Sequence, residues 1–214
     1  TVGGKPIAVT YCPLCGTSMV FDREYNDEVL TFGVSGLLYN SDVLMYDHPS
    51  ESLWSQLMMK SVAGDRVNVE LTWLASTEMT LGAWRDGNED GKVLSTETGF
   101  GRNYHRRAYQ RYFDSPDMMF PVDVRRRELK LKEFVIGIVD DGNAKAYPLS
   151  LIASESPVVL IDRLGEREIE LLIGGTGRGF EARYRDTKDV IPHVRVYWFA
   201  WQGFYPETEV YERV

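Results

Sequence analysis

Two cysteines lie close together near the start of the chain, in the run Tyr-Cys-Pro-Leu-Cys-Gly that holds Cys12 and Cys15. Two thiols separated by two residues share one tight turn, so their sulfurs can close a small disulfide or together hold one soft metal ion. We therefore predict thiol-redox chemistry or metal binding at Cys12 and Cys15. The structural alternative is a short disulfide, or a pair of buried thiols, that braces the turn.

A metal at this turn would need ligands beyond the two cysteines, which are the only ones in the chain. The other soft or borderline ligands are 3 histidines and 7 methionines. A two-thiolate site completed by His or Met favours copper(I) or zinc over magnesium or calcium, and we expect copper before zinc. We predict His48 as the third metal ligand, because its neighbour Asp47 can orient the imidazole ring. Thr17 and Trp54 are expected to support the site. The alternative for His48 is an ordinary hydrogen-bonded surface histidine.

Two other patterns lack the residues that their chemistry needs. Ser52 and Ser55 are outside any Gly-x-Ser-x-Gly sequence, which argues against a serine hydrolase. The glycine-rich segment 175–179 is followed by neither a helix-forming run nor Lys-Ser/Thr, so it is not a phosphate loop. We expect no nucleotide cofactor.

The residues after the cysteines indicate the kind of turn that holds them. Gly16 and Thr17 lead into another strand-like run, whereas the cysteine pair of a thioredoxin-like protein opens a helix. Strand, turn and strand is instead typical of a rubredoxin or zinc-ribbon knuckle, in which glycine permits a left-handed turn residue. The sequence therefore predicts a hairpin that carries both thiols.

The rest of the chain reads mostly as strands. Alternating or β-branched runs, punctuated by Gly, Asn, Asp and Pro, predict strands at 6–11, 19–23, 29–35, 42–47, 67–73, 134–139, 144–148, 158–162, 168–173 and 194–198. The best helix signals are 76–84, where Ser or Thr can cap, and 197–204. Both helices are expected to place tryptophans in the core. Segment 103–117 is expected to be a short helix or an irregular loop.

Internal similarity organises these elements. Ala83-Trp84 and Val93 recur as Ala200-Trp201 and Val210, and the run 7–23 can be laid on 170–186. We therefore expect an α+β, mainly β fold of two diverged tandem repeats that share one core. The predicted divisions are a first repeat with the cysteine turn and the site, a basic connector, and a shorter scaffold repeat, at 1–101, 102–132 and 133–214. The first repeat is expected to be truncated at its N-terminus, because strands 134–139 and 144–148 have no counterpart in it.

Composition and charge limit the class of protein. The chain has 214 residues, of which 43% are hydrophobic and 26% charged, so it can bury a core and is not disordered. Lys plus Arg number 24 against 32 for Asp plus Glu, and the net charge of -8 argues against nucleic acid as a partner. No apolar run approaches the length of a membrane span. The window 102–132 is locally basic, which indicates either a protein-partner surface or a solvated connector.

Several blocks together form a pattern that resembles a known family. They are Val9-Thr-Tyr-Cys-Pro-Leu-Cys-Gly-Thr17, Leu30-Thr-Phe-Gly-Val-Ser-Gly-Leu-Leu-Tyr-Asn-Ser-Asp42, Met45-Tyr-Asp47, Glu51-Ser-Leu-Trp-Ser-Gln56 and Lys145-Ala-Tyr-Pro148. They resemble the family catalogued as domain of unknown function 3179. The resemblance implies a bacterial or archaeal protein, often with an export or lipoprotein signal, and hence an extracytoplasmic location: periplasmic, secreted or lipid-anchored. It implies no activity.

The sequence therefore supports two hypotheses of different classes. The first is a cell-envelope protein that binds copper or zinc, or exchanges disulfides, through the cysteine turn. The second is a non-catalytic interaction or structural subunit of an envelope assembly, in which the basic window and the aromatic end 197–211 are contact surfaces. Whether the protein is an enzyme stays open.

Overall fold

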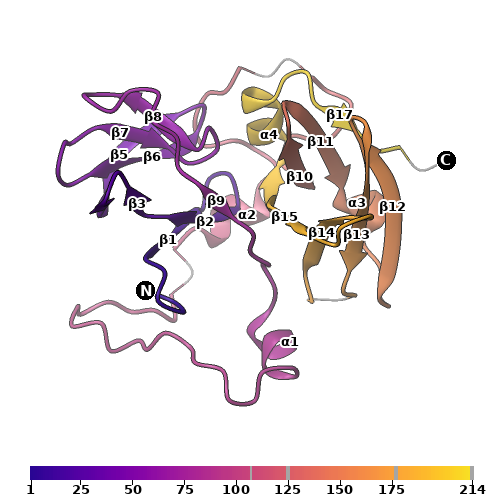
Figure 1. Cartoon of the computed structure of the whole chain (residues 1–214), viewed down its shortest axis with the longest axis horizontal. Coiled ribbons are helices and arrows are strands. Elements are labelled where there is room, and N and C mark those ends of the chain that lie inside the picture. Colours follow the sequence, from indigo (N-terminus) through magenta and orange to yellow (C-terminus); the bar gives the residue numbers. More distant parts are fainter. Residues whose placement is uncertain (107, 124–125, 176–177, 213–214) are drawn as a thin grey trace.

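The structure is a computed structural model that describes residues 1–106, 108–123, 126–175 and 178–212. Within those ranges the chain forms small, mostly antiparallel sheets joined by turns, with a few short helices (Figure 1). The predicted mainly β, α+β class is confirmed.

The cysteine turn joins the first two strands. β1 (Ile7–Cys12) and β2 (Thr17–Asp22) form an antiparallel hairpin, and the short β9 (Trp73–Leu74) pairs with the other side of β2. Gly16 has a φ of 65°, the left-handed conformation predicted for the turn. A separate small hairpin follows, of β3 (Glu24–Tyr25) and β4 (Glu28–Val29). Of the strand predicted at 67–73, only Trp73 lies in a strand, because 67 and 68 belong to a turn and Glu70 makes a single isolated bridge to Lys60 of β8.

A second sheet lies next to this hairpin and has the strand order β5-β6-β7-β8. Its strands are β5 (Phe32–Tyr39), β6 (Asp42–Asp47), β7 (Leu53–Ser55) and β8 (Lys60–Ala63). Asn40 and Ser41 join β5 to β6, and both have positive φ, 46° and 62°. This is the geometry of a tight two-residue hairpin turn. The turn fixes where β6 begins, and therefore where Asp42 lies.

The second half of the chain forms two four-stranded sheets (Figure 1). One has the order β16-β10-β11-β17 and consists of β10 (Phe134–Asp140), β11 (Asn143–Pro148), β16 (His193–Tyr197) and β17 (Glu209–Val210). The other has the order β12-β13-β14-β15 and consists of β12 (Val158–Leu164), β13 (Arg167–Ile173), β14 (Phe180–Tyr184) and β15 (Val190–Ile191). The single-turn helix α3 (Leu149–Ile152) follows β11.

The other helices are short. α4 (Trp198–Phe204) confirms the prediction at 197–204, and its Trp198 and Trp201 are buried. α1 (Leu81–Arg85) is shorter than predicted and has no buried residue, so the expectation that Trp84 lies in the core is wrong. The physical reason is that α1 packs only at the surface, next to a long exposed segment without secondary structure. α2 (Gln110–Asp114) is the helix within 103–117.

The main core takes side chains from both halves of the chain. Cys12, Phe21 and Trp54 of the first half lie in one cluster with Val135 and Trp198 of the second. The buried residues of a smaller cluster all lie between Ile136 and Ile191. The halves therefore cannot be separated without opening the main core, whereas the division into repeats stays a prediction.

Two hairpins have matching ladders. Ile7 pairs with Asp22 across β1 and β2, and Ile169 pairs with Tyr184 across β13 and β14. The same shift in residue number relates two further pairs. The isolated bridge Val2–Lys5 corresponds to Leu164–Arg167, the pair next to the turn between β12 and β13. The ladders thus align Ile7 with Ile169, whereas the comparison of the two sequence runs aligned Ile7 with Glu170.

Two basic side chains of the connector donate hydrogen bonds to backbone carbonyls of the protein itself. Lys132 Nζ donates to the carbonyls of Tyr112 and Ser115. Arg126 donates to the carbonyl of Pro206 at 3.2 Å and lies over the ring of Trp198. These two cations stabilise the path of the connector. Among the described residues, no helix has the length and apolarity that a membrane span requires.

Candidate metal centre

Two hydrogen bonds from other parts of the chain hold the backbone of the cysteine turn. The backbone N–H of Tyr197 donates to the carbonyl of Cys15 at 2.8 Å, and the hydroxyl of Tyr112 donates to the carbonyl of Leu14 at 2.6 Å. Both cysteines are free thiols, and Cys12 and Cys15 are only 1% and 0% exposed. The turn is therefore rigidly placed, with both sulfurs inside the protein.

The turn between β5 and β6 meets the sulfurs from the other side. The Ser41 carbonyl oxygen lies 3.2 Å from Cys15 Sγ and 3.8 Å from Cys12 Sγ. Asp42, the next residue, is completely buried. One ligand atom from each of Cys12, Cys15 and Asp42 can be chosen so that all three lie within 4.8 Å of one another. Two tight turns, far apart in sequence, thus bring two thiols and a carboxyl group together.

The carboxyl group of Asp42 is only half satisfied. Oδ2 accepts a hydrogen bond from the backbone N–H of Leu57 at 3.0 Å. Oδ1 is buried and has no hydrogen-bond partner among the described residues. An acceptor that is left without a partner inside a protein costs free energy, so such an atom calls for an explanation. A bound cation would satisfy it.

The two thiols have different acidities. A hydrogen bond from Cys15 lowers the pKa of Cys12 to about 6, and backbone N–H groups in the turn add to this against the opposing effect of burial. The same hydrogen bond, together with burial, raises the pKa of Cys15. Burial, and then the negative charge of Cys12, raise the pKa of Asp42. Cys12 is therefore the more acidic of the two thiols.

His48 is outside this cluster, contrary to the prediction that it is the third ligand. Its side chain is exposed, its Nδ1 lies 3.0 Å from Thr31 Oγ1, and its ring contacts Tyr46 edge-on. The physical reason is strand length. Asp42 and Asp47 are the two ends of β6, and at about 3.3 Å per residue a strand of this length spans about 17–20 Å.

Asp47 and Trp54, expected to support the cysteine site, bind each other instead. Trp54 Nε1 donates to Asp47 Oδ2 at 2.8 Å, and Ser50 N donates to Asp47 Oδ1 at 2.7 Å. The Arg66 guanidinium lies 3.8 Å from the same carboxylate. This group fixes the turn at the far end of β6, and it is structural.

Thr17 does lie next to the cluster, directly opposite Cys12 in the β1–β2 ladder. Gln56, which sequence reasoning missed, donates to the Thr17 carbonyl at 3.4 Å. Thr17 Oγ1 and Gln56 Oε1 are both buried without a hydrogen-bond partner among the described residues. Gln56 thus joins the strand that follows the cysteine turn to the sheet that carries Asp42.

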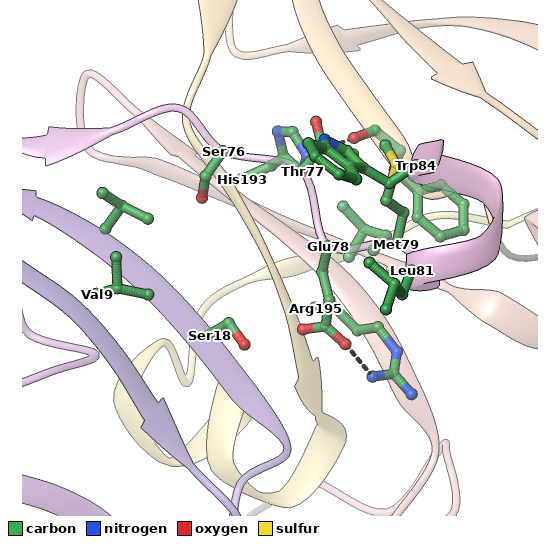
Figure 2. Close-up of a pocket in the computed structure, with 13 residues that line it drawn as sticks. Val9, Ser18, Ser76, Thr77, Glu78, Met79, Leu81, Trp84, His193 and Arg195 are labelled. Carbon is green, nitrogen blue, oxygen red and sulfur yellow. Dashed lines mark hydrogen bonds and ion pairs between the residues drawn. The ribbon is translucent and has the colours of Figure 1, made fainter. Parts of the chain in front are cut away.

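The surface pocket in Figure 2 is separate from this cluster. It has a volume of about 400 Å³ and lies between the β1–β2 hairpin, the second-half sheets and the segment that leads into α1. Glu78 and Arg195 form an ion pair of 2.6 Å there. Neither cysteine lines it.

The fold and the site define a mainly β protein with a buried dithiol–carboxyl cluster. The chain belongs to the family described as "Protein of unknown function (DUF3179)", whose model matches residues 1–208. This confirms the resemblance noted from the sequence. No curated protein and no solved structure matches the chain.

Proposed function

We propose that the protein binds a metal ion through Cys12, Cys15 and Asp42. The observation that carries this proposal is that ligand atoms of all three lie within 4.8 Å of one another inside the protein. The unpartnered Oδ1 of Asp42 supports it, because a cation would give that atom a partner.

Zinc fits this donor set better than the copper favoured by the sequence. Copper(I) prefers soft thiolate and thioether ligands, whereas zinc is bound by cysteine sulfur and by aspartate oxygen alike. The preferred metal therefore changes because the third ligand proposed here is Asp42 and not His48. A tetrahedral zinc ion held by these three residues would keep one further position for a water or another ligand.

Thiol–disulfide exchange is the second candidate, favoured by the lowered pKa of Cys12. The Cys12 thiolate would attack a substrate disulfide, and Cys15 would then attack the mixed disulfide, which leaves a Cys12–Cys15 disulfide and a reduced substrate dithiol. The attack needs access to Cys12 Sγ, yet Cys12 is only 1% exposed. Burial thus favours a small ion over a protein disulfide as the partner of these thiols.

Equilibrium dialysis of chelator-treated, fully reduced protein against Zn²⁺, and separately against Cu⁺, tests the proposal. We expect one zinc per chain in the natural sequence and in His48→Ala, whose histidine is outside the cluster. Cys12→Ser, Cys15→Ser and Asp42→Asn should each weaken zinc binding at least tenfold. Equal zinc binding by the cysteine variants and the natural sequence would refute the site. Loss of binding in His48→Ala would restore the histidine as a ligand.

The cellular context remains the sequence-based proposal of an extracytoplasmic protein. The rival proposal, a non-catalytic subunit whose basic window contacts a partner, predicts that the cysteine variants lose stability and nothing else. Fractionation of cells that make the natural protein would test the location. Metal content measured on the same fraction would separate the two proposals.

A further inference from the structure

The pocket in Figure 2 has walls from both halves of the chain. Ser18 and Val20 of β2 form one wall, and Ile136 of β10 and Phe180 of β14 form another. β2 is the central strand in the order β1-β2-β9, so the first wall is a sheet face and not a strand edge. With a volume of about 400 Å³, the pocket has the size that is typical of a small-molecule site.

A segment without regular structure closes another side of the pocket. It consists of residues 75–80, leads into α1 and is called the bridging segment below. Residues 75–79 make no backbone hydrogen bond to another described residue. The segment meets the second half at Gly179, where a Cβ would lie 2.5 Å from the carbonyl oxygen of Glu78. Because no ladder holds the bridging segment, it can move at a lower cost than the paired strands around it.

Arg195 and Glu78 form the ion pair of the pocket, but the two side chains are not held equally. Arg195 extends from β16, and its guanidinium lies over the Phe134 ring, 3.4 Å from the ring centroid. Glu78 lies on the bridging segment and reaches Arg195 at 2.6 Å (Figure 2). The Glu78 side chain is 36% exposed, and an ion pair that water can reach contributes little to stability. Arg195 is thus the fixed partner, and Glu78 is the partner that can be exchanged.

His193 also lines the pocket, but its ring is already engaged. Its Nδ1 lies 3.1 Å from the carbonyl oxygen of Ile191, and its Nε2 lies 2.7 Å from that of Phe180. Arg195 is therefore the cation that a ligand in the pocket can meet. Among the described residues that line the pocket, Glu78 is the one carboxylate.

Most of the remaining lining is apolar. Met79 of the bridging segment and Leu81 of α1 are 37% and 49% exposed, and Trp84 is half-buried. Apolar surface is thus left for a ligand to cover, which is favourable in water. A fixed cation beside this surface suits a ligand with one negative group and an apolar part.

We propose that this pocket binds a small carboxylate with an apolar tail. The carboxylate would take the place of Glu78 on Arg195, and the tail would lie against Met79, Leu81 and Phe180. The displaced Glu78 carboxylate would enter water, so that no charge is buried without a partner. This proposal is independent of the metal cluster, because neither cysteine lines the pocket.

Decanoate is the probe, and isothermal titration calorimetry of the full chain is the readout, below the concentration at which decanoate forms micelles. We expect one decanoate per chain, bound about tenfold more tightly than decanol, which has the same tail without the charge. Decyltrimethylammonium, a cation with the same tail, should bind no more tightly than decanol. Equal binding of decanoate and decanol, or no binding of decanoate, would overturn the proposal.

Glu78→Gln is the most informative variant, because a gain in binding cannot come from a loss of folding. Removal of the competing carboxylate should tighten decanoate binding about threefold or more and leave decanol binding unchanged. Glu89→Gln removes the same charge at an exposed position outside the pocket, and it should change neither. Arg195→Gln should bind decanoate no better than decanol. Decanoate binding that is the same in Glu78→Gln, Arg195→Gln and the natural sequence would refute the exchange at Arg195.

Methionine methyl NMR locates the bound probe. Met79 lines this pocket, whereas Met45 lines a groove between β1 and β5. Decanoate should shift the methyl signal of Met79 and leave that of Met45 in place. A shift at Met45 without one at Met79 would place decanoate in the other groove and overturn the assignment of this pocket.

Discussion

At the scale of single residues, the role of Asp42 in metal binding can be separated from its effect on the stability of the fold. Its carboxyl group is buried beside two thiols, and one of its oxygens has no partner. A buried carboxylate without compensation is costly, whereas an asparagine can still accept from the Leu57 N–H. In the presence of a chelator, we predict that Asp42→Asn is as stable as the natural sequence or more stable by about 1–2 kcal/mol.

With zinc present the order should reverse, because the metal stabilises only a folded site that can bind it. Urea unfolding with and without zinc measures both differences. A variant that is destabilised equally in both conditions would show that Asp42 has a purely structural role.

At the scale of the element, Asp47 anchors the end of β6 and gives a pH-dependent prediction. Burial alone would raise its pKa, but hydrogen bonds from Trp54 and Ser50 and the charge of Arg66 outweigh this, so the pKa of Asp47 is lowered. A lowered carboxyl pKa stabilises the folded state above the pKa of the unfolded chain, and this stabilisation is lost as the pH falls through the folded value.

We therefore predict that Asp47→Asn costs about 2–3 kcal/mol at neutral pH, and that its deficit shrinks as the pH falls below about 4. Urea unfolding across that range measures the deficit. Zinc binding should be unchanged, since Asp47 is outside the metal cluster. A deficit that stays constant with pH would contradict the assigned role.

The cysteine turn is a second element with a matched pair of variants. Gly16 has a φ of 65°, and a Cβ there would lie 2.7 Å from the Phe134 ring. Gly36 has a φ of 78°, but a Cβ there would meet nothing within 4 Å. Gly36→Ala should cost only the left-handed backbone, about 1 kcal/mol.

Gly16→Ala should cost about 2 kcal/mol more than Gly36→Ala and should weaken zinc binding, because Phe134 must move. Thermal unfolding of the two variants measures the difference. Equal costs would mean that the turn is not packed tightly against β10.

At the scale of the whole molecule, hydrogen bonds within the connector fix its path between the two halves. Lys132 donates to the carbonyls of Tyr112 and Ser115, whereas Lys130 is exposed and has no described side-chain partner. Lys132→Met should therefore destabilise the protein by about 1–3 kcal/mol, since it leaves two carbonyls without their charged donor. Lys130→Met is the control and should change stability by less than about 0.5 kcal/mol. Equal effects of the two substitutions would refute the proposal that the hydrogen bonds of Lys132 stabilise the connector.

Local pattern predicted much of the fold and only part of the site. The period-2 runs placed β1, β6 and β10 correctly, and the glycine after Cys15 indicated the hairpin, because these features depend on neighbouring residues. Asp42 was missed because only the packing of the β5–β6 turn against the cysteine turn brings it to the sulfurs. The visible signal was its place directly after Asn-Ser, a two-residue hairpin turn that fixes the start of a strand.

His48 shows the converse error. An Asp-His pair at a strand end has the right chemistry, but the length of β6 keeps it away from the thiols. Trp84 was expected in the core from its likeness to Trp201, yet α4 packs against β10 and β16 whereas α1 has no buried residue. Residue type alone could not show these differences, because they arise from contacts between distant segments.

X-ray absorption at the zinc edge of the reconstituted protein tests the central claim most directly. We predict two sulfur ligands at about 2.3 Å and oxygen ligands at about 2.0–2.2 Å, without the outer-shell scattering of an imidazole. The oxygen contribution should decrease in Asp42→Asn. A spectrum with no sulfur, or with imidazole in place of the carboxylate, would contradict the proposed site at Cys12, Cys15 and Asp42.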